Sequence, residues 1–139
     1  MRVQKYFCPL SIALMLTVAA CGGGSSSTTP PSAAVTTETF SGTVAIGGKD
    51  FHSFTVKQTG EVDLTLTAAG PPPTISMGLG VGTMNGSACS LLPGGSTNTQ
   101  AGTAVQLAGT VSAGTLCVQV YDIGNQTAPI TYTVTVAHH

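Results

Sequence analysis

One histidine, His52, lies inside the chain, since the other two are the last residues, His138 and His139. A histidine can act as a general base because its ordinary pKa lies near neutrality. Such a base needs a nucleophile and an orienting group, and the chain has no Gly-x-Ser-x-Gly motif. His52 alternates with Phe54 and Val56, so we expect it to point inward as a buried or edge histidine satisfied by the backbone. A catalytic base is the alternative, but without a catalytic motif we expect no enzyme.

Carboxylates are the second group with possible chemistry. Calcium takes about six to eight oxygen ligands, and the spacing of the acidic residues matches no compact calcium-binding loop. We therefore expect solvated carboxylates on turns and strand faces, with no cofactor, and we keep a calcium site as the alternative. The residues concerned are Asp50, Glu61, Asp63 and Asp122.

The first twenty residues have the layout of a secretory signal peptide. Arg2 and Lys5 give a positive start, residues 7–20 carry no charge, and small residues close the segment. The apolar run is shorter than the roughly 20 residues that a spanning helix needs, and it contains Pro9. We expect residues 1–20 to direct export and then to be removed.

The apolar run ends in VAAC, with the cysteine at Cys21, and this motif resembles the lipobox of bacterial lipoproteins. The resemblance implies that Cys21 carries a covalent lipid, becomes the first mature residue and anchors the chain to a membrane of the cell envelope. Two or more acyl chains anchor a protein stably. Gly22 stands where retention in the inner membrane typically requires Asp, which favours the outer membrane in a cell with two. Residues 21–37 are rich in Gly, Ser, Thr and Pro and are expected to form a flexible linker.

Cys8 lies in the signal peptide and Cys21 is expected to carry the lipid, so two cysteines remain. In an exported protein the even pair Cys89 and Cys117 predicts a disulfide. Cys117 is out of phase with the apolar residues on either side of it. We therefore expect the bridge on an outer face or an edge, partly exposed, where it clamps residues 91–102.

Residues 38–139 are expected to form one all-β domain, a two-sheet antiparallel β-sandwich of about seven or eight strands. Apolar and polar residues alternate in several short runs, and clusters of Gly, Pro and Asn separate these runs. A turn is expected at Pro93-Gly94-Gly95. The predicted strands are 39–46, 51–57, 62–68, 75–81, 87–91, 103–107, 115–121 and 130–136.

Within this domain, residues 42–68 and the later segments SAGTLCVQVYD and ITYTVTV resemble the bacterial pre-peptidase C-terminal domain, a β-sandwich attached to secreted enzymes. The chain is also similar to small uncharacterised lipoproteins that carry this domain alone. The resemblance implies a sandwich fold, and because its motifs are short and structural it supports the fold far better than any activity. His52 and Leu116 stand where the family usually has an aromatic residue. The matching residues are Asp50, Phe54, Val56, Ala113, Gly114 and Thr115.

Two outward-facing groups of side chains are candidate binding surfaces. Phe51 and Tyr121 are the aromatic residues predicted to face outward, and they could anchor a small contact. A charge-poor set of threonines suits strands by propensity alone, with a hydroxyl-rich surface for polysaccharide or another ordered target as the alternative. These threonines are Thr65, Thr67, Thr131, Thr133 and Thr135.

The charge balance excludes nucleic acid as a partner. The formal net charge is −1, and two of the four basic residues, Arg2 and Lys5, belong to the signal. Nucleic-acid binding requires a basic footprint that the rest of the chain lacks. We therefore expect a non-catalytic, lipid-anchored envelope protein whose sandwich binds an envelope protein or polysaccharide, or acts as a spacer. The alternatives are a structural subunit of an envelope complex and a hydrolase-associated or weakly catalytic domain that uses His52.

Overall fold

The structure is a computed structural model and describes residues 34–139. The signal peptide, the lipidated Cys21 and nearly all of the linker were predicted in residues 1–33, which lie outside the described range. From residue 34 onward, no helix is long and apolar enough to cross a membrane.

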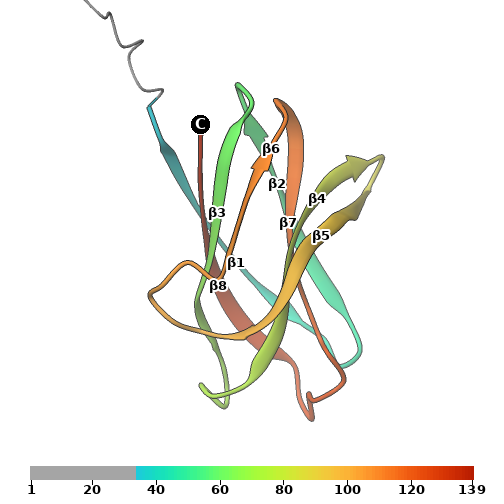
Figure 1. Cartoon of the computed structure of the whole chain (residues 1–139). Helices are drawn as coiled ribbons and strands as arrows, with labels where there is room; N and C mark the ends of the chain where they lie inside the picture. The colour runs from blue at the N-terminus through green and yellow to red at the C-terminus, as the bar shows by residue number, and fades with distance from the viewer. Residues whose placement is uncertain (1–33) are drawn as a thin grey trace, which may run out of the picture. The chain divides into compact units, whose positions relative to one another are not determined.

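The described residues form two antiparallel four-stranded sheets that pack face to face, as Figure 1 shows, so the predicted β-sandwich is confirmed. The order β1-β8-β3-β6 makes up one sheet, called the threonine sheet below, and β2-β7-β4-β5 makes up the other, called the disulfide sheet. The strands are β1 Thr36–Val44, β2 Lys49–Val56, β3 Gly60–Gly70, β4 Ser76–Asn85, β5 Ala88–Gln100, β6 Leu107–Val111, β7 Gly114–Tyr121 and β8 Ile130–His138.

The core lies between the sheets because each strand turns an apolar face toward the opposite sheet. Side chains alternate across a strand, so the apolar residues of each predicted run meet those of the opposite sheet. Burial of one such Val, Leu or Met side chain stabilises the fold by about 1.5–3 kcal/mol. The alternation predicted in β3, β4, β7 and β8 is confirmed by the fully buried residues Val62, Leu64, Leu66, Met77, Leu79, Val118, Val120, Val134 and Val136.

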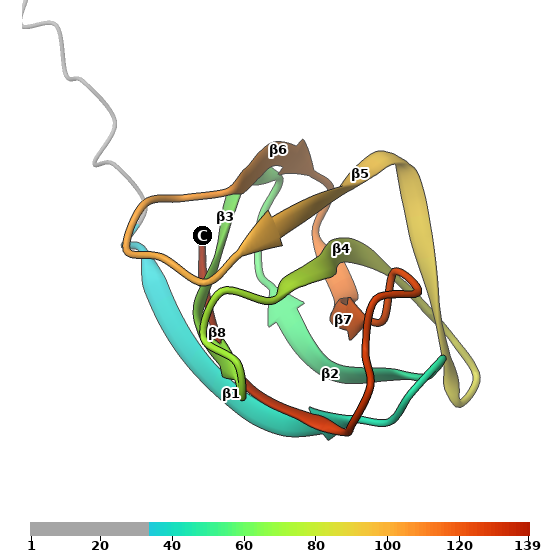
Figure 2. The same ribbon diagram turned by 90° about the horizontal axis from the view of Figure 1, so that it is seen from below.

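The two sides of the sandwich differ in which strands border them. Figure 2 shows β1 and β2 along one side and β5 and β6 along the other. These four strands are the edges of the two sheets. Their unpaired backbone groups therefore lie at the sides of the molecule.

The turn predicted at Pro93-Gly94-Gly95 is wrong, because β5 continues through these residues. Gly82 pairs with Leu91 and Gly80 pairs with Ser96, so residues 92–95 bulge out opposite a single residue of β4. Gly94 has φ +71, in the left-handed region that glycine adopts most readily. A strand predicted to end at Leu91 therefore runs on to Gln100.

The strand predicted at 103–107 is also wrong, because β6 only begins at Leu107. Residues 101–106 instead follow the edge of β3 as an irregular segment. The Gly102 amide donates to the Leu66 carbonyl at 2.8 Å, and the Gln106 amide donates to the Leu64 carbonyl at 3.0 Å. The Gln106 side chain accepts from the Leu66 amide at 2.6 Å, so a side chain replaces the ladder that a strand would supply.

Candidate binding surface

Hydroxyl side chains stand in rows on the outer face of the threonine sheet. Paired residues of antiparallel strands share a face, and Thr39, Thr135 and Thr65 are paired across β1, β8 and β3. Neighbouring strands lie about 4.8 Å apart, and alternate residues of one strand about 6.8 Å apart. The resulting array, called the hydroxyl grid below, contains Thr39, Ser41, Thr43, Thr131, Thr133 and Thr135 of β1 and β8, beside which Thr65 of β3 is buried.

Hydrogen bonds within the sheet orient part of this grid. The Ser41 and Thr133 hydroxyl oxygens lie 3.0 Å apart and share a hydrogen bond. Thr131 donates its hydroxyl to the Gly70 carbonyl at 3.0 Å, and Thr135 makes a longer contact of 3.5 Å to the Thr65 carbonyl. The hydroxyl oxygens that donate these bonds present lone pairs outward, whereas the Thr39 and Thr43 hydroxyls make no hydrogen bond to residues 34–139 and can donate or accept. The grid therefore offers hydroxyl oxygens, some of them also donors, beside methyl groups.

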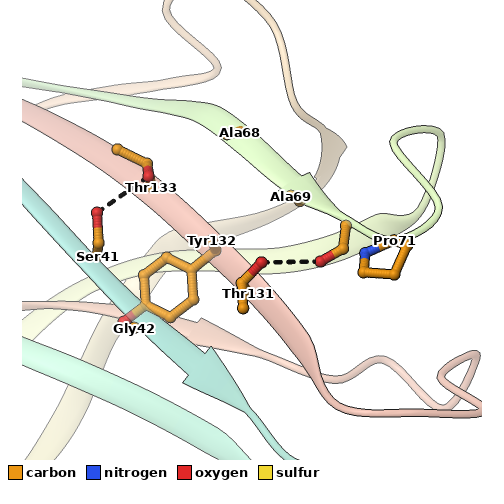
Figure 3. A pocket seen from close by; sticks show the side chains of 9 residues that line it. Ser41, Gly42, Ala68, Ala69, Pro71, Thr131, Tyr132 and Thr133 are labelled. Carbon is orange, nitrogen blue, oxygen red and sulfur yellow. Dashed lines mark hydrogen bonds between the residues drawn. The ribbon is translucent and has the colours of Figure 1, made fainter.

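A shallow hollow of about 580 Å³ lies at one end of the grid, as Figure 3 shows. Ser41, Thr131 and Thr133 line it from β1 and β8, while small residues of β3 such as Ala68 leave the space above the sheet open. The pairing of β3 with β8 shifts register between Leu66 and Ala68, so a β-bulge re-aims this end of the strand. The grid therefore ends in a depression that an extended ligand could enter.

The four carboxylates kept as an alternative calcium site do not come together. Within residues 34–139, no group of three or more His, Cys, Asp or Glu side chains lies close enough to hold a metal ion. Glu61 and Asp63 alternate with the buried Val62 and Leu64, which places both carboxylates on the outer face of β3. Asp50 and Asp122 lie elsewhere, each in its own hydrogen-bonded environment.

Asp122 is a hydrogen-bond acceptor for two connections at one end of the sandwich. Its Oδ2 accepts from the Gly47 amide at 2.7 Å, in the turn between β1 and β2. Its Oδ1 accepts from the amides of Gly124 at 2.8 Å and Asn125 at 3.1 Å, after β7. These backbone donors, that of Gly47 first, lower the pKa of Asp122 because they favour the charged form. Its position therefore indicates a structural role.

Asp50 and Tyr132 join the two sheets. The Tyr132 hydroxyl donates to Asp50 Oδ2 at 2.9 Å, and Asp50 Oδ1 accepts from the Phe51 amide at 2.9 Å. Burial first, and then the neighbouring Asp50 carboxylate, raise the pKa of Tyr132, so its phenol keeps the proton that it donates. Gly42 leaves room for this bond, because a Cβ there would collide with the Asp50 carboxylate.

His52 points inward as predicted, and packs as an aromatic ring. It is half-buried, with its ring stacked on Phe40 at a centroid distance of 5.0 Å and an interplanar angle of 11°. Its Nε2 lies 4.0 Å from Asp50 Oδ2, beyond hydrogen-bond distance. The prediction that the backbone satisfies the ring is wrong, because His52 Nε2 is buried without a hydrogen bond in the described residues. The Tyr132 hydroxyl, which lies in the same cluster, already donates to Asp50.

Phe51 and Tyr121 lie on the outer face of the disulfide sheet, as predicted, and both are half-buried. The Tyr121 ring covers Gly78, its partner on β4, so closely that a Cβ at Gly78 would overlap the ring. An aromatic side chain that covers a cross-strand glycine replaces the packing that glycine lacks. Tyr121 therefore has a structural contact in addition to its exposed part.

The Cys89–Cys117 disulfide is formed, as predicted, and joins β5 to β7 across β4. The predicted partial exposure is wrong, because Cys117 is 0% and Cys89 7% exposed. Gly82 of β4 is the partner of Cys117, and a Cβ at Gly82 would lie 2.7 Å from the Ser90 carbonyl carbon. The absent side chain lets β5 fold closely over β4 and bury the bridge. The alternating glycines of SMGLGVG are the signal that sequence reasoning missed.

Comparison with known proteins adds no family to this description. No family model matches the chain, and no curated protein matches it. The function proposed next therefore rests on the geometry of the hydroxyl grid and on the sequence features described above.

Proposed function

We propose that this chain is a lipid-anchored, non-catalytic protein of the cell envelope whose β-sandwich binds an ordered polysaccharide through the hydroxyl grid. The observation that carries the proposal is the register of β1 and β8, which pairs hydroxyl residues at three successive outward positions, Thr39 with Thr135, Ser41 with Thr133 and Thr43 with Thr131. The lipobox resemblance at Cys21 supports the anchor, and the linker would hold the sandwich away from the bilayer.

The chemistry of the grid suits a ligand that is itself rich in hydroxyl groups. A polysaccharide offers hydroxyl donors at regular intervals, and the grid offers acceptor oxygens at the regular intervals of a sheet. The chain contains no tryptophan, so ring stacking on an indole does not contribute. Each contact is weak alone, and affinity would come from many contacts made at once. This predicts binding to a long polymer and little affinity for a monosaccharide.

The lack of charged side chains in the grid also favours a neutral polymer as the ligand. No position of the grid holds a charged residue, and the nearest carboxylates on the same face, Glu61 and Asp63, lie toward the opposite end of β3 from the hollow at Ala68. An acidic polymer would have to approach these carboxylates without a cation to balance them. A neutral polymer avoids that repulsion.

A sedimentation assay tests the proposal. The full chain, produced in cells and purified, is mixed with an insoluble neutral glucan, and the bound fraction is measured as the glucan concentration rises. A variant with Thr39→Val, Thr133→Val and Thr135→Val removes three hydroxyls and keeps the branched shape. Because each hydrogen bond contributes about 0.5–1.5 kcal/mol, we expect at least a roughly tenfold loss of affinity.

A matched control comes from the disulfide sheet. Thr55 and Thr115 are paired, exposed threonines of β2 and β7, and a Thr55→Val, Thr115→Val variant removes hydroxyls outside the grid. We expect this variant to bind as the unchanged chain does. Equal losses in both variants, or no retention of the unchanged chain by any insoluble polysaccharide of the envelope, would overturn the proposal.

A second candidate is a structural subunit of an envelope complex. It is favoured by Phe51 and Tyr121, two half-buried aromatic side chains on the outer face of the other sheet. Aromatic side chains with one apolar face and partial exposure are common anchors of protein interfaces. A stoichiometric protein partner recovered with the chain from membranes, and lost in a Phe51→Ser variant, would favour this role over the first.

A further inference from the structure

The four edge strands of the sandwich differ in how well their backbones are protected. An edge strand presents unpaired N–H and C=O groups, and soluble proteins commonly block them with bulges, prolines, lysines, inward charges or short length. The edges here are β1 and β6 in the threonine sheet and β2 and β5 in the disulfide sheet. Three of these strands are blocked by shape or by lysines, and the fourth carries only a single inward charge.

The edges on the side of β5 and β6 are protected by shape. β6 is five residues long, too short to support an extended ladder. β5 is interrupted by its bulge at residues 92–95, and Pro93 within the bulge has no N–H to donate. An incoming strand would find no continuous run of backbone groups on this side.

The edge strand β2 is protected by charge. Lys49 begins the strand and Lys57 directly follows it, and an incoming strand would have to desolvate these ammonium groups. Its backbone is also partly occupied, because the Phe51 amide donates to the Asp50 carboxylate. Another strand would have to displace that charged acceptor.

The edge strand β1 carries only one of these devices, the inward-directed charge of Glu38. Its nine residues, Thr36–Val44, contain no proline, lysine or arginine, and they pair with β8 without a shift in register. Its one charge, Glu38, lies 2.9 Å from the Nε2 of the buried His138. Among residues 34–139, no side chain or loop is hydrogen-bonded to the backbone of residues 36–43 beyond the ladder with β8, and at the last residue, Val44, the carbonyl accepts from the Gln126 side-chain amide at 3.3 Å. The outer edge of β1 is therefore open to pairing with another strand.

We propose that β1 pairs with β1 of a second copy of this chain, antiparallel and about a two-fold axis, so that the two threonine sheets become one continuous sheet. A two-fold pairing covers both exposed edges at once and closes the assembly. The strand is rich in threonine, which suits a ladder by propensity. This inference concerns assembly and does not depend on the polysaccharide proposed above.

The sequence of β1 is compatible with itself in one register in particular. When Thr39 lies opposite the second Thr39, Glu38 lies opposite Phe40 and Thr37 opposite Ser41. No like charges then face each other, whereas a register that sets Glu38 opposite Glu38 would be repulsive. The same register carries the outward-facing hydroxyls of β1 across the axis, so the hydroxyl grid would extend over both copies.

Cross-linking in membranes of the producing cells tests the pairing in the full chain. A Thr39→Cys variant places a thiol on the exposed outer face at the two-fold axis, where directly opposed Cβ atoms lie about 4.5–5.5 Å apart and can form a disulfide. Under mild oxidation we expect a covalent dimer at least tenfold more abundant than in the unchanged chain, which controls for any free thiol elsewhere. Thr110→Cys on β6 and Thr55→Cys on β2 are matched controls on the other edges and should give no such dimer.

A second variant guards against a fortuitous collision of thiols. Adding Thr37→Lys to Thr39→Cys places a charge on the pairing strand without touching the core, since residue 37 is exposed. We expect the covalent dimer to fall at least tenfold. The proposal would be overturned by a dimer that persists in this variant or by equal cross-linking at Thr110→Cys. It would also be overturned if no dimer forms with a thiol at position 37, 39 or 41, which would mean that another segment or no segment covers β1.

Discussion

Tyr132 and Asp50 lie 82 positions apart in the chain, and the Tyr132 hydroxyl donates to Asp50 Oδ2 at 2.9 Å. Tyr132 belongs to β8 of the threonine sheet and Asp50 to β2 of the disulfide sheet. This bond therefore ties the two layers together at the side of the sandwich where β1 and β2 lie. Gly42 of β1 leaves the space that the bond occupies.

Replacing Tyr132 with Phe should destabilise the fold, because it removes this bond and leaves the Asp50 oxygen without its donor. We expect a loss of about 1–3 kcal/mol in the free energy of unfolding, measured by urea denaturation. Tyr121→Phe is the control, since the Tyr121 hydroxyl has no hydrogen bond to residues 34–139. Equal stabilities of the two variants would contradict the role given to Tyr132.

The same tyrosine predicts a loss of stability in base. Its pKa is raised in the folded protein, so the unfolded chain releases this proton at a lower pH than the folded chain does. Stability from this group is full below the ordinary tyrosine pKa of about 10 and falls as the pH rises above it. Between pH 8 and pH 11 the free energy of unfolding should therefore fall more steeply with pH for the unchanged chain than for Tyr132→Phe. An equal fall in both proteins would exclude the effect.

Asp122 predicts the opposite dependence in acid. Its pKa is lowered in the folded protein, so its contribution is full above the unfolded value of about 3.9 and is lost as the pH falls through the lower folded value. Compared with Asp122→Asn, the unchanged chain should lose stability more steeply below about pH 4. Asp63→Asn is the control. If the difference in free energy of unfolding between the unchanged chain and Asp122→Asn stays constant from pH 6 to pH 2, the hydrogen-bonded geometry of Asp122 is contradicted.

Gly82 should tolerate no side chain, because a Cβ there would meet the backbone of Ser90 on β5. We expect Gly82→Ala to cost about 1–3 kcal/mol, as overpacking commonly does. Gly109→Ala on β6 is the matched control, since a Cβ there meets nothing within 4 Å. A Gly82→Ala variant as stable as Gly109→Ala would show that β5 does not approach Gly82 of β4 so closely.

Removal of the Cys89–Cys117 bridge should be costly. The two cysteines are 28 positions apart, and a loop of that size corresponds to about 3–4 kcal/mol in the chain-entropy model. A variant with Cys89→Ala and Cys117→Ala should lose stability of this order in urea. A loss below about 1 kcal/mol would indicate that the unfolded chain is already compact without the bridge.

Much of the fold was predictable because local patterning and burial agree. In β3 and β8, alternation identifies the buried residues directly, since Leu64 and Val134 follow the period of a strand. The pairing of Cys89 with Cys117 was predictable by elimination. The outward threonines of β8 were predictable from the same period, but their alignment with Thr39 and Thr65 required the register of three strands.

The remaining features depend on contacts between distant parts of the chain. Pro93-Gly94-Gly95 has the composition of a turn and of a bulge alike, and only the pairing of β5 with β4 distinguishes them. The burial of Cys117 depends on the close approach of β5 to Gly82, and the bond from Tyr132 to Asp50 joins two sheets. No local pattern records such relations.

The anchor at Cys21 has its own test. Cells grown with radiolabelled palmitate should incorporate label into the chain, and the chain should be recovered with membranes. Cys21→Ala should abolish both, because no acyl chain would remain to hold the protein. Label in the Cys21→Ala variant, or an unlabelled chain that fractionates away from membranes, would contradict the lipid anchor.

The most direct test of the central claim is a map of the threonine methyl resonances by NMR while soluble fragments of the retained polysaccharide are added. Binding through the hydroxyl grid predicts shifts at Thr39, Thr133 and Thr135 that saturate together, with Thr55 and Thr115 unchanged. Shifts confined to Thr55 and Thr115, or none at any threonine while the chain still binds the polymer, would contradict the account.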